Sequence, residues 1–387
     1  MKVGFYYQIE ASVHEGVLFM PALLGVFVDD LASRVEQLTL LVHIAPYDSN
    51  LHDYALDSNR IKWVSLGRKQ NFPRRLLLGR KTLANLPAEA FDFDILLVRV
   101  PTPLAPALYS IFSSKVPVAF MIVGDYSMQP VKRFSASWTM NRIYERMVNH
   151  RVLPHCLAMV NSAALRNKYE RICREVVQIK TTTLKNSDFF FRDDTCNGNL
   201  IYLLYVGRFD WQKGFQELFE SIVELRKNTN IRLHLVGWDT DAQKLNQRRM
   251  EKTISDLGIS EQVIIEGYKK VGEELNKMYE MADIFVLPSY AEGFPRCIWE
   301  ALAHGVPVVA TTVGGIPENL TDSENALLIP PHSTKKLTDA VEEIINNVSL
   351  RKMIIKNGYA LVNDATLEVQ GERIVEILKN ELENNKI

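Results

Sequence analysis

The chain has 387 residues, of which 47% are hydrophobic and 24% charged, and this length predicts two domains rather than one core. The sequence contains no run of about 18 apolar residues and no signal-peptide pattern, so we expect a cytoplasmic protein without a membrane-spanning helix. The four cysteines are scattered without a CxxC pair, which argues against a disulfide framework or a zinc site.

The near-neutral net charge of −1 hides an asymmetry between the two halves of the chain. Residues 1–190 contain 23 Lys and Arg against 16 Asp and Glu, whereas residues 191–387 contain 22 against 30. A basic first half and an acidic second half predict two domains that face different partners.

In chain order, the first half alternates strand-length apolar runs with helix-like stretches. The loop after the first run contains Gly16, which we expect at the start of a helix, where its backbone N–H would face a phosphate. The strand candidates of this half are residues 2–7, 38–43, 61–65, 94–99, 117–122, 156–160 and 176–179.

The second half shows the same alternation more clearly. Its strand candidates are residues 201–206, 231–236, 262–265, 283–287, 306–310 and 326–329. Amphipathic stretches lie between them at 213–227, 241–257, 272–281 and 295–304. This rhythm predicts an α/β protein with parallel sheets covered by helices on both faces.

The stretch at 184–199 mixes Asp, Asn and Gly without a usable period, and it marks a domain boundary. We therefore predict a first domain at 1–187, a linker at 188–199, a second domain at 200–365 and a final helix at 366–387. Both domains are expected to be doubly wound and Rossmann-like, with ligands at the carboxyl ends of the strands.

Two carboxylates frame the loop and helix after the strand at 283–287. Glu292 lies in the loop and Glu300 in the helix, and ionised carboxylates accept hydrogen bonds from sugar hydroxyls. Their offset would span roughly 12 Å in a continuous helix. Hydrolase pairs lie about 5–9.5 Å apart, which disfavours a glycosidase. Taken alone, the two residues are equally well explained as ordinary surface acids.

A cationic segment follows the strand at 201–206. Gly207 ends this strand, and Arg208 and Lys213 precede the next helix. Two cations at a helix N-terminus form a phosphate site, although two solvated surface cations give the same pattern. Further along, Gly314-Gly315 with Pro317 favours either a second ligand-facing loop or a plain tight turn.

Together these motifs resemble the donor domain of the retaining family 4 glycosyltransferases, which have the GT-B fold of two Rossmann-like domains with an inter-domain cleft. The resemblance covers about 130 residues in matching order and spacing. The matching segments are Gly207-Arg208 with Lys213-Gly214, Glu292-Gly293-Phe294 with Glu300-Ala301, Gly305-Val306-Pro307-Val308-Val309, and Gly314-Gly315-Ile316-Pro317-Glu318.

The resemblance implies a role for each matching position. Arg208 and Lys213 would hold the diphosphate of a nucleotide-sugar donor, and Glu300 would bind the ribose. Glu292 would hold the donor sugar with the backbone at Gly293, Phe294 and Pro295. Gly207, Gly237 and Tyr268 would complete the donor site. The resemblance further implies retention of anomeric configuration, no metal or cofactor, and a final helix that packs back on the first domain.

The first half departs from the family pattern. Many members carry a His after the strand that corresponds to 117–122, and Gly124-Asp125 stands there in this chain. Either Asp125 takes over a sugar contact or the donor preference differs. His14, in the first loop, is either an acceptor contact or an ordinary loop histidine.

Basic residues gather in two stretches of the first half, 67–81 and 132–151. The first holds six cations around Leu76–Leu78, a pattern typical of contact with an anionic membrane surface and equally of a solvated helix face. We expect peripheral contact with the inner face of a membrane, because lipid-linked acceptors are common in this family. Nucleic acid is not expected, because no recognition motif is present.

The expected activity is transfer of a sugar from a nucleotide-sugar to a hydroxyl of a glycan or lipid-linked acceptor, in polysaccharide, lipopolysaccharide or glycolipid biosynthesis. Two alternatives stay open. One is a phosphorylase or nucleotide-sugar epimerase of the same architecture, and the other is a nucleotide-sugar-binding protein without turnover.

Overall fold

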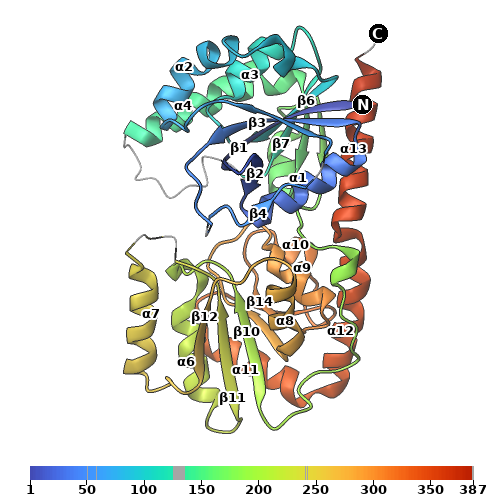
Figure 1. Ribbon diagram of the computed structural model, residues 1–387. Coiled ribbons are helices and arrows are strands. Elements are labelled where there is room, and N and C mark those ends of the chain that lie inside the picture. Colours follow the sequence, from blue (N-terminus) through green and yellow to red (C-terminus); the bar gives the residue numbers. More distant parts are fainter. Residues whose placement is uncertain (50, 58, 125–135, 240, 242, 386–387) are drawn as a thin grey trace. The chain divides into compact units, whose positions relative to one another are not determined.

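The computed structural model describes residues 1–385 except 50, 58, 125–135, 240 and 242 (Figure 1). The chain divides into two compact units. The first consists of Met1–Thr183 with Leu367–Ile387, and the second of Leu184–Thr366.

The first unit is built on a mainly parallel sheet. Its central strands run in the order β5-β3-β1-β6-β7-β8-β9, and β2 and β4 extend from the far end of β1 in antiparallel pairing. The strands are β1 (Lys2–His14), β2 (Val17–Met20), β3 (Gln37–Ile44), β4 (Tyr54–Ala55), β5 (Ile61–Ser65), β6 (Ile95–Val100), β7 (Val118–Ile122), β8 (Leu157–Val160) and β9 (Glu175–Gln178).

Helices bury both faces of this sheet. One apolar core joins the sheet to α1 (Ala22–Arg34) and to α13 (Leu367–Asn384), through residues such as Leu31 and Leu378. The other core joins it to α2 (Phe72–Ala84), α3 (Ala105–Phe112), α4 (Ala136–Arg151) and α5 (Ala163–Tyr169). The last helix of the chain is thus an integral part of the first unit.

The predicted position of Gly16 at a helix start is wrong. β1 continues to His14 and pairs with β2 as a hairpin, in which His14 lies opposite Val17. Glu15 and Gly16 form its two-residue turn with φ of 50° and 80°. A positive φ at both central residues is what a type I′ turn requires, and glycine supplies it without strain. Helix α1 begins only at Ala22, so Gly16 presents no helix N-terminus to a ligand.

The second unit contains a six-stranded parallel sheet in the order β12-β11-β10-β13-β14-β15. The strands are β10 (Ile201–Val206), β11 (Ile231–Val236), β12 (Val263–Gly267), β13 (Ile284–Leu287), β14 (Val308–Thr311) and β15 (Leu327–Ile329). All lie within three residues of the predicted runs, because the strands of a doubly covered parallel sheet are continuously apolar.

Helices pack in two groups around this sheet. α6 (Phe215–Leu225) contacts α7 (Leu245–Asp256) and α11 (Thr334–Asn346). α9 (Arg296–Ala303) contacts α8 (Glu273–Met281) and α12 (Val348–Val362). A single apolar core, which includes the fully buried Trp299 and Phe219, unites the sheet with these helices.

The predicted linker at 188–199 is in fact part of the second unit. Arg192 donates to the backbone carbonyls of His304 and Tyr279, both at 2.8 Å. Asp194 accepts from the buried Arg351 at 2.6 Å. These polar contacts join positions far apart in the sequence, so no local sequence pattern predicts them.

Candidate functional site

The candidate residues of the second unit gather at the carboxyl edge of its parallel sheet. β10 lies between β11 and β13, so successive connections leave β10 in opposite directions. This reversal of strand order is where open α/β sheets bind ligands. The loop after β10 carries Arg208 and Lys213, and the loop after β13 carries Glu292. The fold therefore brings two motifs about 80 residues apart to one place.

Lys213 and Glu292 form a nearly buried ion pair. The Lys213 Nζ donates to Glu292 Oε1 at 2.6 Å, and the two side chains are 12% and 10% exposed. The Ser289 hydroxyl donates to the same oxygen at 2.8 Å. Glu292 Oε2 makes no hydrogen bond to the part of the chain that the structure describes. A fixed carboxylate with one open oxygen suits a ligand hydroxyl.

The backbone holds the two loops together. Tyr290 N–H donates to the Gln212 carbonyl at 2.8 Å, which joins the loop after β13 to the one after β10. Gly315 N–H donates to the Gly293 carbonyl at 2.7 Å, which joins it to the loop after β14. Thr311 Oγ1 donates to the Ser289 carbonyl at 2.6 Å. Three loops thus fix the position of Glu292 before any ligand binds.

Gly314 makes this packing possible. Its φ is +54°, and a Cβ there would lie 1.8 Å from the Glu292 carbonyl oxygen. We expect Gly314→Ala to lower the free energy of unfolding by about 3 kcal/mol, because left-handed strain alone costs about 1–2 kcal/mol and the collision adds to it. Chemical denaturation of the purified protein measures this.

Gly258→Ala is the matched control. Its φ of +65° imposes the same backbone strain, but nothing lies within 4 Å of the added methyl group. A loss in Gly314→Ala no larger than in Gly258→Ala would contradict the close-packed loop.

Glu300 lies on α9 and is 9% exposed. The Tyr279 hydroxyl donates to Glu300 Oε2 at 2.8 Å, and His304 Nδ1 lies 2.7 Å from the Glu300 carbonyl. Burial, followed by the charge of Glu300, raises the pKa of Tyr279 well above its usual range, so the phenol stays a donor. Tyr279 therefore orients the carboxylate of Glu300.

The remaining candidates line the same edge. Arg208 is exposed, and Tyr205 fixes its backbone by donating to the Arg208 carbonyl at 2.9 Å. Gly207 and Gly237 directly follow β10 and β11. Tyr268 follows β12 and meets Trp238 edge-on, with ring centroids 5.5 Å apart. Phe294 and Pro295 directly precede α9, and the Phe294 ring packs on Trp299 of that helix.

Sequence reasoning missed several residues here. Ser289 and Tyr279 carry no motif, and only their contacts show that they orient Glu292 and Glu300. Tyr290 forms a third group: its hydroxyl donates to Glu217, and its ring lies 3.8 Å from that of His332. No spacing rule links positions 217, 290 and 332, so the sequence held no usable signal for this group.

Three candidates of the first half lie elsewhere or outside the description. His14 is exposed at the end of β1 and stacks on Tyr47, with ring centroids 4.3 Å apart. Gly16 lies in the adjacent turn. Asp125 lies outside the described residues.

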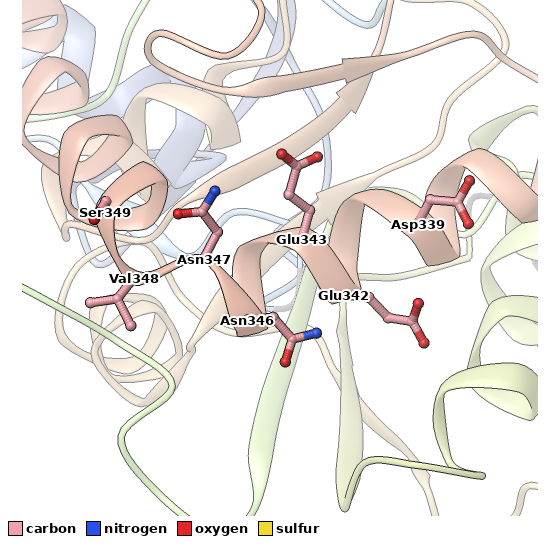
Figure 2. Close-up of a pocket in the computed structure, with 7 residues that line it drawn as sticks. All are labelled: Asp339, Glu342, Glu343, Asn346, Asn347, Val348 and Ser349. Carbon is pink, nitrogen blue, oxygen red and sulfur yellow. The ribbon is translucent and has the colours of Figure 1, made fainter.

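Another hollow of the second unit has the wrong charge for a nucleotide. Figure 2 shows it at the junction of α11 and α12, where the side chains of Asp339, Glu342 and Glu343 line it with four neighbours. Like charges would repel a diphosphate there. No group of three or more His, Cys, Asp or Glu side chains within the described residues is arranged to hold a metal ion. Within the same residues, no helix is long and apolar enough to cross a membrane.

Comparison with known proteins agrees with this geometry. Residues 186–361 match the family described as "Glycosyl transferases group 1". A D-inositol 3-phosphate glycosyltransferase of Paenarthrobacter aurescens is 30% identical over 154 residues, which is 39% of this chain and 37% of that protein. An uncharacterised glycosyltransferase of Methanocaldococcus jannaschii is 29% identical over 155 residues, covering 40% of this chain and 38% of the relative. The matches thus span about two fifths of these relatives' length.

Solved structures match almost the whole chain at low identity. A sucrose-phosphate synthase from Thermosynechococcus elongatus superposes with a TM-score of 0.73 and 17% identity, covering 99% of this chain and 100% of that one. HepE of Anabaena in complex with UDP gives 0.71 and 17%, covering 98% and 100%. The likeness to these structures confirms the predicted GT-B fold.

Proposed function

We propose that the protein is a retaining glycosyltransferase of the family 4 type, which transfers a sugar from a nucleotide-sugar to a hydroxyl of a glycan or lipid-linked acceptor. The observation that carries the proposal is the Lys213–Glu292 pair at the switch point of the second sheet. The cation and the carboxylate lie 2.6 Å apart. The cation would contact the donor phosphate, and the carboxylate would contact a hydroxyl of the sugar attached to it.

The chemistry follows from these charges. When the bond between the anomeric carbon and the phosphate breaks, negative charge grows on the leaving phosphate. Arg208 and Lys213 would stabilise this charge more in the transition state than in the bound donor, which is what accelerates the reaction. The departing phosphate would accept the proton of the acceptor hydroxyl on the same face of the sugar. Glu292 Oε2 would hold a sugar hydroxyl meanwhile.

The experiment that tests the proposal is a donor screen. UDP-, GDP- and ADP-sugars are incubated with the purified protein, with and without EDTA, and slow release of the nucleoside diphosphate is measured. We propose that no metal takes part, so EDTA should not change the rate. HepE is solved with UDP and UDP-glucose, which puts uridine donors first in the screen.

The outcomes of the screen separate the alternatives. Release of a sugar phosphate that requires inorganic phosphate would show a phosphorylase, and a changed sugar with an intact diphosphate would show an epimerase. Calorimetric binding of a nucleotide-sugar without any turnover would show a binding protein. Failure of every nucleotide-sugar to bind would refute the proposal itself.

We also propose that the first unit contacts an anionic membrane surface through α2, as a cytoplasmic protein on the inner face would. Leu77 and Leu78 are 79% and 52% exposed on this helix. The side chains of Arg74, Arg80 and Lys81 are exposed beside them. Exposed leucines among cations match a helix that lies at a lipid interface.

Vesicle flotation tests the membrane contact. We expect binding to anionic vesicles at low salt that weakens at high salt, because the Debye length falls to about 3 Å at 1 M. The double variant Leu77→Ser/Leu78→Ser should float several-fold less than the wild type. Val348→Ser changes a residue 48% exposed that lines the acidic hollow of Figure 2, and it should float normally. Absence of wild-type flotation at low salt would reject the contact.

A further inference from the structure

A second group of polar side chains lies in the first unit, at the carboxyl ends of its strands. Tyr6 comes from β1, His43 from the end of β3, and Arg75 from the first turn of α2. Lys69 lies in the segment between β5 and α2. The pairing of β1 with β3 shifts register between Tyr6 and Glu10, at the point where this group gathers. We call these four residues the Arg75 cluster.

Arg75 is the centre of the cluster. Its Nε and Nη1 atoms are buried and have no hydrogen-bond partner in the part of the chain that the structure describes. Its charge acts on Tyr6, His43 and Lys69. A guanidinium keeps its charge at any physiological pH and carries five N–H donors, so buried donors without acceptors are costly.

His43 adds a second polar group that lacks a hydrogen-bond partner among the described residues. It is 3% exposed, and neither ring nitrogen makes a hydrogen bond of acceptable geometry to a described residue. Burial and then the charge of Arg75 lower the pKa of His43 to about 4, against a smaller opposing effect of the Gly67 backbone. The neutral imidazole retains one N–H that can donate to a ligand.

The cluster has an open, cationic rim. The Lys69 side chain is exposed, and its pKa is lowered by partial desolvation and by the charge of Arg75. The charge of the Glu10 carboxylate raises the pKa of Lys69 and so opposes these two effects. Among the described residues, no carboxylate forms an ion pair with Arg75 or Lys69. The site therefore combines fixed positive charge with buried donors, and none of the described carboxylates forms an ion pair with its cations.

We propose that the Arg75 cluster binds an oxyanion, a phosphate group of the acceptor. The buried N–H groups of Arg75 and the buried imidazole of His43 would donate to its oxygens. The exposed ammonium of Lys69 would contact the oxyanion from the solvent side. The assignment to the acceptor rests on the proposed glycosyltransferase function, whereas binding of the oxyanion does not. Arginine suits this task because its planar donor array matches phosphate oxygens.

Calorimetric titration with inorganic phosphate at constant ionic strength tests the site in the full-length protein. Arg75→Met keeps the apolar stem and removes the charge, and Lys69→Gln changes only the exposed rim. We expect phosphate affinity to fall by about tenfold or more in Arg75→Met and by several-fold in Lys69→Gln. Arg171→Gln removes an exposed charge elsewhere in the first unit and should bind phosphate like the wild type.

Two further arms separate this site from the donor site and from a purely structural role. Lys213→Ala should still bind phosphate here, because its change lies in the second unit. Unliganded Arg75→Met should melt no lower than the wild type, since it removes two buried N–H donors that have no acceptor among the described residues, whereas an arginine needed for folding predicts a lower Tm. Should Arg75→Met fail to fold, Lys69→Gln and His43→Asn decide the question by the same titration.

The source of the oxyanion is distinguished by comparing glycerol 3-phosphate in solution with vesicles that contain phosphatidic acid. Two losses in the Arg75 and Lys69 variants support the site. Loss of binding to glycerol 3-phosphate identifies a soluble phosphate, and loss of a preference for phosphatidic acid over phosphatidylserine vesicles of equal charge identifies a lipid phosphate. Wild-type affinity in both variants, or no phosphate binding by the wild type, overturns it. That outcome leaves the donor screen unaffected, and a failed donor screen leaves phosphate binding at Arg75 testable.

Discussion

Lys213→Ala should lower kcat by about 10²–10³-fold while the protein stays folded. Lys213 is the cation that Glu292 holds at the edge of β10, with its Nζ 2.6 Å from the carboxylate. Its removal would leave the charge on the departing phosphate unbalanced in the transition state, so kcat should fall more than donor affinity. Steady-state kinetics of donor hydrolysis, or of transfer once an acceptor is known, measures both.

Lys227→Ala is the matched control for this variant. Lys227 also pairs with a glutamate, at 2.5 Å, but both side chains are more than half exposed and the pair lies at the far end of α6. Exposed pairs contribute little, so kcat should stay within about twofold. Unchanged kinetics in Lys213→Ala would remove the central support of the proposed function.

The loss of Lys213 also leaves Glu292 nearly buried without its cation, which complicates a single substitution. The double variant Lys213→Ala/Glu292→Gln removes that unpaired charge. Because Glu292→Gln also changes the proposed sugar contact, the loop is tested by melting: a loop displaced by the unpaired charge predicts a Tm that falls in Lys213→Ala and recovers in the double variant. We expect it to stay inactive, because the phosphate still lacks its cation.

Glu300→Ala should weaken nucleotide binding by about 10–100-fold, because hydrogen bonds to a charged group contribute about 1.5–3 kcal/mol. The buried carboxylate is held by the Tyr279 hydroxyl at 2.8 Å, so it is already oriented for the ribose contact that we propose. Calorimetric titration with the nucleoside diphosphate found in the donor screen gives the dissociation constant directly. The change should appear in binding rather than in kcat, since the ribose lies away from the bond that breaks.

Two further variants give the comparison for Glu300→Ala: Tyr279→Phe should have an intermediate effect on nucleotide affinity, and Glu343→Ala is the control. Tyr279→Phe keeps Glu300 but removes the donor that orients it, so affinity should fall only a few-fold. Glu343→Ala removes an exposed carboxylate of α11 in the hollow of Figure 2 and should leave affinity unchanged. An affinity in Glu300→Ala equal to that of Glu343→Ala would exclude a ribose contact.

The sequence by itself determined the class of the fold and the edge of the second sheet at which the candidate residues lie. The strands of the second unit are continuously apolar because helices cover both faces of their sheet, and that signal is local. Gly207, Arg208, Lys213, Glu292 and Glu300 stand at fixed offsets from strand ends, so spacing along the chain was enough to predict where they lie. In a parallel sheet, the topology then carries them to a common edge.

Only the tertiary structure decided the remaining features, because each depends on contacts between distant positions or on backbone angles. Gly16 closes a hairpin, since two adjacent residues take positive φ, and its sequence context resembled a helix start equally well. Residues 188–199 dock on the second unit through Asp194 and Arg351, which lie 157 positions apart. In the sequence, Arg75 is one of six cations in a basic stretch. The structure shows that two of its nitrogens are buried without a partner among the described residues, as are both ring nitrogens of His43. A polar group that is buried away from water needs a hydrogen-bond partner, and the sequence alone does not predict which group that partner is.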